Sequence, residues 1–169
     1  RIFNTTGPGK IGDVCSDLAR RLAEMELGLR SPVLPVGNLS TRRAILDAHD
    51  LVNALWLSAT RCEPGEAYNV CAAETHSVEE LIEMFRLHTT VPFVTERDPG
   101  LVRRCDEPVI LGDSSRFQRA TGWRPTHALQ NTVQEMLAWW RERLCSELAA
   151  QRFSSHPQPD AEGAILITV

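Results

Sequence analysis

The sequence predicts an α/β fold, and two observations carry that prediction. Short apolar, β-prone runs alternate with amphipathic helical stretches along the chain. The first such run, Ile2-Phe3, leads into Asn4 and then the Gly7-Pro8-Gly9 turn, a pattern typical of a buried strand that ends in a tight loop. Because ligands bind beyond strand ends in open α/β sheets, this loop is the first candidate for a binding site.

The first helix is predicted from Asp13 to about Leu29, because apolar residues recur there at spacings of three and four. Asp13 is the expected N-cap and Gly28 marks the far end. On the same periodicity, Arg20 and Arg21 face outward.

The middle of the chain alternates extended and helical segments. Extended pieces are expected at residues 33–36, 67–71 and 91–94, and residues 39–46 should be turn-like and then extended. One helix opens at Asp47, and another opens at the capping box Ser77-Val78-Glu79-Glu80. The apolar face of the helix that Asp47 opens should comprise Leu51, Ala54 and Leu55.

The last third predicts two further helices. A brief apolar piece at residues 109–113 ends at a helix N-cap, and that helix stops at Thr121-Gly122-Trp123-Arg124-Pro125, a glycine C-cap followed by proline. A final helix over about residues 129–148 should bury Val133, Leu137, Trp140 and Leu144 or their neighbours. Residues 151–169 are expected to form a mobile tail.

Composition narrows the class of protein. A net charge of −4 over 169 residues gives no basic footprint for nucleic acid or an anionic membrane. No apolar run is long enough for a membrane span. The five cysteines lack C-x-x-C spacing and the five histidines lack ligand spacing, so no disulfide framework and no metal site are predicted. A reducing, cytoplasmic location is expected.

The few strands pose a packing problem. A doubly wound sheet of about three strands leaves apolar faces uncovered, which costs about 25 cal/mol per Å². We therefore expect missing sequence, a partner chain or an unusually compact remnant.

Four motifs at family spacing resemble those of extended short-chain dehydrogenase/reductases that act on nucleotide sugars. They are R-x-F-N-x-x-G-P-G at residues 1–9, G-N-L-x-x-R-R at 37–43, D-P-x-x-x-R-x-x-D-x-P at 98–108 and T-G-W-x-P at 121–125. The resemblance covers roughly residues 1–142. Val36-Gly37-Asn38-Leu39 and Tyr68-Asn69-Val70-Cys71 are most similar to the GDP-sugar branch, the GDP-6-deoxy-4-keto-mannose reductases and GDP-mannose 4,6-dehydratases.

The resemblance implies roles for six residues. Ile2 and Phe3 would flank the nicotinamide of NAD or NADP, and Asn4 would reach the substrate pyrophosphate and sugar. Arg43 and Arg103 would clamp the diphosphate, and Asp106 would reach the ribose hydroxyls. A planar guanidinium suits phosphate because it binds two oxygens at once.

Three of these residues also have a simpler interpretation. Asn4 could cap the turn, Arg43 could be a solvated surface arginine, and Asp106 could be a turn former. Ala44 stands where the family has an acidic residue after the second arginine, and this is expected to leave Arg43 less firmly oriented.

The resemblance further implies the C-terminal part of an extended short-chain dehydrogenase, a Rossmann-like fold, without its N-terminal nucleotide-binding half. Residues 1–30 would be a residual Rossmann strand, loop and helix, and residues 31–150 the sugar-nucleotide-binding region interleaved with the last Rossmann elements. The catalytic Tyr-x-x-x-Lys and the glycine-rich cofactor turn have no counterpart in the sequence.

No catalytic residue is therefore assigned, and turnover by this chain alone is not expected. The predicted function is nucleotide-sugar binding as part of an NAD(P)-dependent reductase, dehydratase or epimerase, with a homo-oligomer or the missing half as possible partner. The alternative is a non-catalytic, diverged binding or scaffold module.

Overall fold

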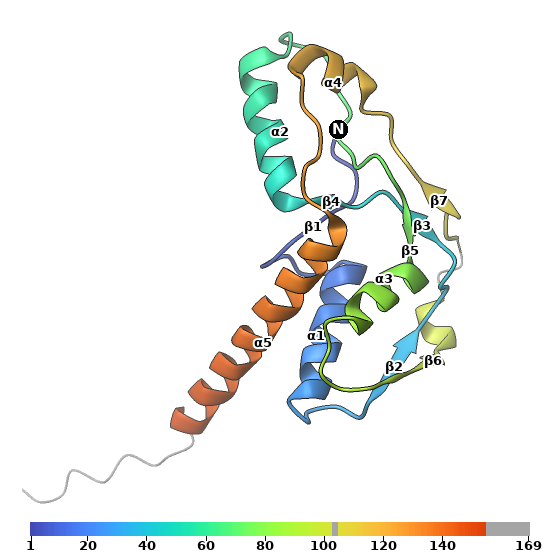
Figure 1. The fold of residues 1–169 in the computed structure, drawn as a ribbon, viewed down its shortest axis with the longest axis vertical. Helices are drawn as coiled ribbons and strands as arrows, with labels where there is room; N and C mark the ends of the chain where they lie inside the picture. Colours follow the sequence, from blue (N-terminus) through green and yellow to red (C-terminus); the bar gives the residue numbers. More distant parts are fainter. Residues whose placement is uncertain (103–104, 155–169) are drawn as a thin grey trace, which may run out of the picture.

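The computed structural model describes residues 1–102 and 105–154. Figure 1 shows short strands and helices that alternate along the chain, which confirms the α/β class. The elements in order are β1 (Thr5–Thr6), α1 (Val14–Glu26), β2 (Val33–Val36), β3 (Arg42–Arg43), β4 (Leu46–Asp47), α2 (Ala48–Arg61), β5 (His76–Ser77), α3 (Val78–Arg86), β6 (Val94–Arg97), the 3-10 turn η1 (Pro99–Leu101), β7 (Val109–Ile110), α4 (Ser115–Thr121) and α5 (Leu129–Ser154).

The strands form three small sheets. β1 pairs with β4 and β2 pairs with β6, both in parallel. β3 lies between β5, which is antiparallel to it, and β7, which is parallel. Parallel strands need crossover connections, and α1 and α2 supply crossover segments here.

The predicted strand at residues 67–71 is wrong in extent, because it is reduced to a single parallel bridge between Val70 and Ile2. The Phe3 amide donates to the Val70 carbonyl at 3.1 Å, and the Val70 amide donates to the Arg1 carbonyl at 2.9 Å. The predicted opening strand is shifted as well: the ladder to β4 is made by β1, and Ile2 is half exposed.

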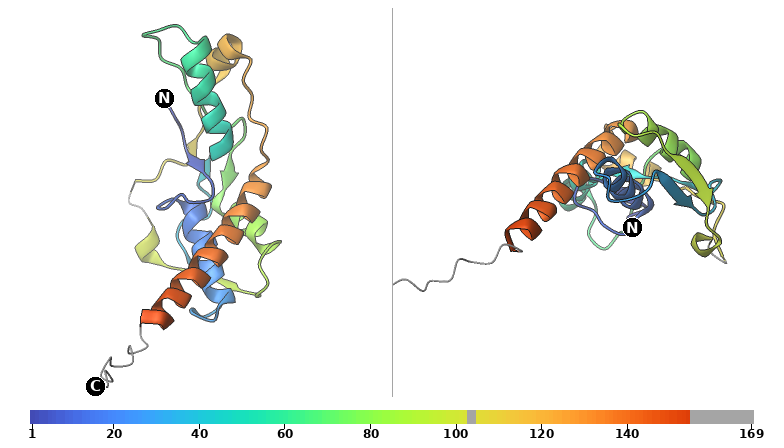
Figure 2. Two further views of the ribbon diagram at one scale, coloured as in Figure 1. Left: turned by 90° about the vertical axis from the view of Figure 1, so that its left-hand side faces the viewer. Right: turned by 90° about the horizontal axis from the view of Figure 1, so that it is seen from below.

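The main core lies between α1, α3 and α5. Helix α5 runs diagonally along α1, and its C-terminal end projects beyond the other elements (Figures 1 and 2). The four residues predicted to be buried on α5 are all in this core: Val133, Leu137, Trp140 and Leu144. Helix α5 continues to Ser154, past the predicted end at residue 148 and into the segment predicted as a tail; residues 155–169 lie outside the described part of the chain.

A second core joins α2 to α4 and the T-G-W-R-P turn. Gly122 is left-handed at φ 74° and ends α4 as predicted. Trp123 is buried next to Phe117, and its indole N–H donates to the Asp50 carbonyl at 3.2 Å. This turn thereby fixes α2 against α4.

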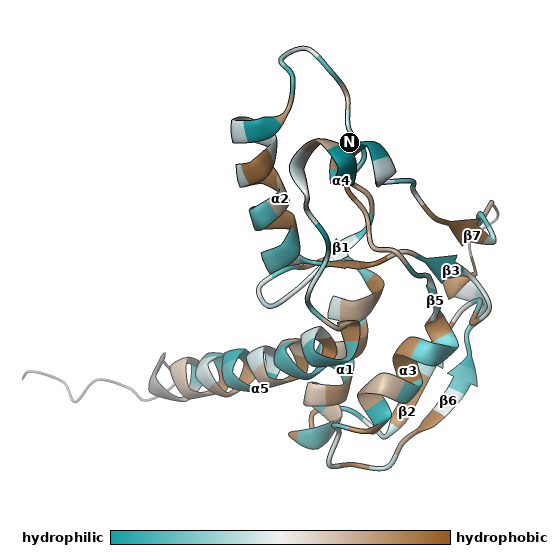
Figure 3. Ribbon diagram, turned by 45° about the horizontal axis from the view of Figure 1, so that its top comes forward, coloured by the Kyte–Doolittle hydropathy of each residue, from teal (hydrophilic) through white to brown (hydrophobic). Residues whose placement is uncertain are grey.

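Helix α2 buries fewer of its apolar side chains than its periodicity predicts. Ala54 is fully buried and Leu51 packs at the edge of the second core, but Leu55 is 50% exposed, which corrects the prediction. Val52 and Trp56 are exposed too, and α2 carries apolar patches in Figure 3. An uncovered apolar face is what a chain with so few strands was expected to leave.

Helix caps follow the sequence closely. The Asp13 carboxylate accepts from the Ser16 amide, and both halves of the predicted capping box at Ser77 and Glu80 are formed. Gly28, with φ 69°, follows the end of α1. Over the described residues, no helix combines the length and the apolar character that crossing a membrane requires.

One partly buried ion pair joins α1 to α5. Arg141 donates twice to the Glu26 carboxylate, at 2.6 and 2.8 Å. The Thr89 hydroxyl and the Thr90 amide donate to the same carboxylate at 2.9 Å each. Burial alone would raise the pKa of Glu26, but the hydrogen bonds from Arg141, Thr90 and Thr89 outweigh it and lower the pKa to about 2.

We predict that Glu26→Gln lowers the free energy of unfolding by about 1–3 kcal/mol near neutral pH, because charge-assisted hydrogen bonds are lost. A carboxylate with a depressed pKa stabilises the fold fully above its ordinary value of 4.5, and this contribution is lost as the pH falls toward about 2. The deficit of the variant should therefore shrink below about pH 4.5.

Urea unfolding of both proteins between pH 7 and pH 3 measures this difference. The control is Glu147→Gln, which removes an exposed pair with Arg143 on α5 and should change stability by less than about 1 kcal/mol. A deficit that stays constant over this pH range would contradict the assigned ion pair.

Candidate functional site

The candidate site is a pocket of about 370 Å³ at the carboxyl ends of the short strands. Its walls come from the segment around β1, the first turns of α1, the end of β2 and strand β3. This is the position at which open α/β sheets bind ligands. The pocket lies where the chain leaves β1 and β2 and where it enters α1.

Three of the predicted substrate residues line this pocket together: Asn4, Arg43 and Asp106. They come from three distant parts of the sequence. The carbonyl of Asn4 accepts from the Leu46 amide at 2.9 Å, which fixes its backbone beside β4. Within the described residues, its side-chain amide makes no hydrogen bond to the following turn, so the amide remains available at the pocket.

Arg43 is held firmly at the pocket wall. One terminal nitrogen, Nη2, donates to the Asp106 carboxylate at 2.6 Å, and the other, Nη1, donates to the carbonyls of Glu107 at 2.7 Å and Arg42 at 2.9 Å. The side chains of Arg43 and Asp106 are each 17% exposed. The expectation that Ala44 leaves Arg43 loosely oriented is therefore wrong, because Asp106 and two carbonyls orient it instead.

The neighbouring arginine points elsewhere, because successive side chains of a strand alternate between faces. Arg42 donates to Glu80 at 2.8 Å and to the Thr75 carbonyl at 2.7 Å, away from the pocket. Of the two arginines on β3, Arg43 alone lines the pocket. The strand register therefore selects which arginine faces the pocket.

The sequence prediction missed further residues of the pocket. Arg21 was expected to face outward, but it lines the pocket and donates to the Pro35 carbonyl at 3.0 Å. The missed signal is its position three residues after buried Leu18, which puts both on one side of α1. Asn38 lines the pocket as well. Arg21 and Arg43 are its two cationic side chains among the described residues.

Gly37 lets the backbone of η1 close one side of the pocket. A Cβ at position 37 would lie 2.5 Å from the Leu101 carbonyl oxygen, which is too short for any real contact. Leu101 is itself part of the pocket wall. The glycine of the G-N-L motif therefore serves the close approach of two chain segments.

The expected cofactor residues lie beside the pocket rather than in its wall. The Phe3 ring packs tightly against Gly112, since a Cβ at position 112 would lie 2.6 Å from that ring, and 2.9 Å from the Cys71 sulfur. Ile2 bridges Val70 and remains half exposed. Arg103, predicted as the second phosphate clamp, lies outside the described residues.

Comparison with known proteins gives a consistent family. The model of the family described as GDP-mannose 4,6 dehydratase matches residues 1–136. A GDP-6-deoxy-D-mannose reductase of Pseudomonas aeruginosa is 32% identical over 148 residues, which cover 87% of this chain and 49% of the relative. Human GDP-mannose 4,6 dehydratase is 28% identical over 156 residues, which cover 80% of this chain and 41% of the relative.

Solved structures agree with this family assignment. The structure of RMD from Pseudomonas aeruginosa complexed with NADPH superposes with a TM-score of 0.79 at 31% identity, over 85% of this chain and 48% of that one. A UDP-glucose-4-epimerase from Stenotrophomonas maltophila with bound NAD and formylated UDP-arabinopyranose gives a TM-score of 0.70 at 24% identity, over 86% and 48%. The latter likeness shows the fold alone. The chain spans about half the length of the curated relatives it matches.

We predict that Gly37→Ala lowers the melting temperature, because the added methyl group collides with the backbone of η1. Overpacking of this kind costs about 1–3 kcal/mol. Thermal unfolding followed by circular dichroism measures the effect. Gly100→Ala in the same turn is the matched control, since its methyl group would meet only the movable end of the Asp98 side chain, at 3.1 Å. Equal melting temperatures of wild type and Gly37→Ala would refute the role of this close approach.

Proposed function

The chain belongs to the GDP-mannose 4,6-dehydratase family, and we propose that its pocket binds the diphosphate of a nucleotide sugar, most specifically of a GDP-deoxyhexose. The observation that carries the proposal is Arg43, a largely buried guanidinium in the wall of an open pocket beside Asn4 and Asp106. The choice of a GDP-sugar as the ligand rests on the relatives named above, a GDP-6-deoxy-D-mannose reductase and a GDP-mannose 4,6 dehydratase.

Arg43 has donors to spare for a phosphate. Three hydrogen bonds to described residues use three of the five N–H groups of its guanidinium, so two remain. The bonds that are already made fix the plane of the fork, and a fixed fork binds phosphate oxygens with little further loss of side-chain entropy. Arg103 would be the second phosphate ligand, on the strength of its motif.

The neighbouring side chains suit the rest of such a ligand. The Asn4 amide both donates and accepts, as sugar and phosphate oxygens require. Asp106 would accept from ribose hydroxyls on the side away from Arg43. The role of Arg21 would be to add positive charge at the other end of the pocket, near Pro35.

The cofactor of the proposed reaction is NAD or NADP, as in the reductase structure that holds NADPH. Ile2 and Phe3 offer an apolar surface next to the pocket, which fits one face of a nicotinamide ring. A bound nicotinamide would supply the hydride, whereas the residues of this chain bind and orient the sugar nucleotide.

The sequence does not hold the acid–base pair of this chemistry. Its single tyrosine, Tyr68, is followed four positions later by Ala72 rather than lysine. Proton transfer would therefore depend on residues outside this sequence. The second candidate function is a non-catalytic, diverged binding or scaffold module, which the departures from the family motifs at Ala44 and Arg104 favour.

We predict that the purified chain binds GDP and GDP-mannose in isothermal titration, and binds UDP-glucose and NADPH more weakly or not at all. Arg43→Ala should weaken GDP-mannose binding roughly 10- to 100-fold, because charge-assisted hydrogen bonds contribute about 1.5–3 kcal/mol. Arg43→Lys should recover only part of the loss, since lysine keeps the charge without the fork.

The matched control is Arg42→Ala, which removes the adjacent arginine on the opposite face of β3. It should bind GDP-mannose as wild type does. If Arg42→Ala and Arg43→Ala lose affinity equally while both remain folded, or if no GDP ligand binds the folded wild-type chain, the proposed site is wrong.

A separate assay addresses catalysis. We expect no oxidation of NADPH by this chain alone with a GDP-4-keto-6-deoxyhexose, because it carries no Tyr-x-x-x-Lys motif. Absorbance of NADPH followed over time measures the rate, with a full-length reductase as the positive control. Turnover above the rate without protein would disprove the assignment of the catalytic groups to residues outside this sequence.

A further inference from the structure

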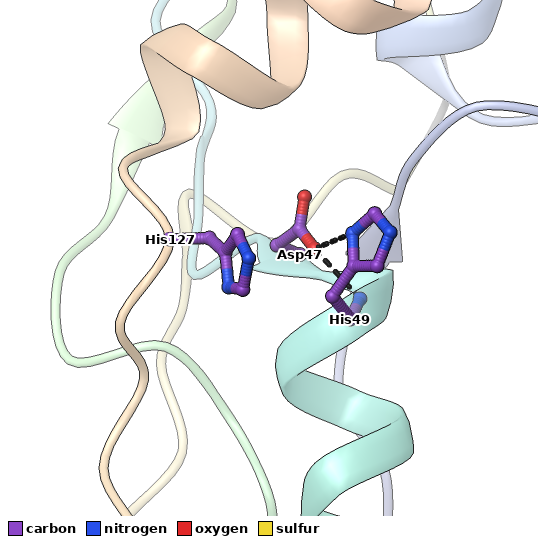
Figure 4. A group of neighbouring side chains, drawn as sticks. All are labelled: Asp47, His49 and His127. Atoms are coloured by element: carbon purple, nitrogen blue, oxygen red, sulfur yellow. Dashed lines mark hydrogen bonds and ion pairs between the residues drawn. The ribbon is translucent and has the colours of Figure 1, made fainter.

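A second group of polar side chains lies where α2 begins and shares no lining residue with the pocket described above. Asp47 is the N-cap of α2, His49 lies in its first turn, and His127 lies just before α5. One ring nitrogen of each histidine and one carboxylate oxygen of Asp47 all lie within 4.8 Å of one another. Figure 4 shows both imidazole rings beside the Asp47 carboxylate.

We propose that Asp47, His49 and His127 bind a divalent transition-metal ion of the zinc class. Imidazole nitrogens with one carboxylate suit Zn²⁺, Ni²⁺ and Cu²⁺, whereas Mg²⁺ and Ca²⁺ require mostly oxygen ligands. Three protein ligands on an open surface leave at least one coordination position for water or another small ligand.

The surrounding hydrogen bonds orient the proposed ligands. The Nδ1 atom of His127 lies 2.9 Å from the buried Asp50 carboxylate, and Nδ1 of His49 lies 2.9 Å from Asp47. The Thr132 hydroxyl donates to the other Asp47 oxygen at 2.7 Å. In metal sites, a carboxylate outside the ligand set holds a ligating histidine, as Asp50 holds His127, and a ligating carboxylate is itself hydrogen-bonded, as Asp47 is by Thr132. His49 would ligate through Nδ1, the nitrogen that faces Asp47, with the ion in place of the proton that the two groups share.

The proposed ligands have lone pairs left with which to bind a metal ion. Within the described residues, Nε2 of His127 makes no hydrogen bond, because Asp50 takes the other ring nitrogen. Three donors reach the Asp47 carboxylate, the amide and ring of His49 and the Thr132 hydroxyl, whereas a carboxylate has about four lone-pair sites. The two buried carboxylates of Asp47 and Asp50 also oppose the positive end of the α2 dipole, which would otherwise repel a cation.

The movement needed to bind an ion is small. Metal–nitrogen and metal–oxygen bonds of about 2.0–2.2 Å place tetrahedral ligand atoms about 3.3 Å apart, so the group must contract by up to about 1.5 Å. The side chains that must move are the imidazoles, which are 62% and 43% exposed, whereas Asp47 and Asp50 are anchored. The rings stack 22° from parallel with centroids 5.3 Å apart, so they must also rotate before their in-plane lone pairs converge on one ion.

His49 lines a surface hollow of about 550 Å³ together with Glu135 and Trp139. The His127 side chain is 43% exposed, so an ion can reach both histidines from solvent. Glu135 adds negative charge to the lining of the hollow.

Metal titration of the purified 169-residue chain tests the proposal. Exposed Cys105 and Cys145 could bind zinc on their own, so Cys105→Ser/Cys145→Ser is the background for all proteins. We expect one Zn²⁺ per chain in isothermal titration, at least about tenfold weaker binding in His49→Ala and in His127→Ala, and no binding of Mg²⁺. Co²⁺ should give a visible absorption band that the double variant lacks.

His76→Ala is the matched control, because His76 also lies near a carboxylate, Glu80 at 3.5 Å, but pairs with Arg43 of β3 and is not part of this group. It should bind zinc as the background does. Circular dichroism establishes that each variant is folded, and His49→Gln with His127→Gln replaces any alanine variant that is not. Failure of Zn²⁺ to bind, or undiminished binding to the folded double variant, would overturn the proposal and leave the sugar-nucleotide pocket untouched.

Discussion

The buried carboxylate of Asp47 is the constraint on which the arrangement of this chain depends. Asp47 ends β4, pairs in register with Thr6 of β1, caps α2 and accepts a hydrogen bond from Thr132 of α5. A carboxylate that is 3% exposed must have its hydrogen bonds satisfied, so these elements cannot move independently. Asp50, one turn later, ties the residues after the T-G-W-R-P turn to the same helix.

Because Asp47 holds β4, α2 and α5 together, short strands are sufficient to build a pocket. Strand β3 has only two residues, yet its pleat directs Arg42 to one side and Arg43 to the other. The Asp106 carboxylate and two carbonyls then hold the guanidinium of Arg43 at the pocket wall. The pocket therefore depends less on the length of its strands than on where each strand ends.

The sequence predicted the features that depend on local physics. The Ser77 capping box, the glycine stop at Gly122 and the buried face of α5 follow from hydrogen bonding and periodicity within a few residues. The site residues Asn4, Arg43 and Asp106 came from motif resemblance, and the structure places them in one pocket.

Apart from the end of α5, the errors involve contacts between distant segments. Leu55 has the periodicity of a core residue, but no element in the described part of the chain buries its side of α2. Arg21 lies on the same side of α1 as buried Leu18, and the end of β2 turns toward it, so it lines the pocket. Ala44 removes a neighbouring carboxylate, yet Asp106 supplies one from far along the chain. The histidines show the same limit, because no spacing of residues 49 and 127 reveals that α2 and the segment before α5 meet at Asp47. Long-range geometry of this kind follows from the fold, and in this chain it determines both the proposed phosphate-binding arginine and the proposed metal ligands.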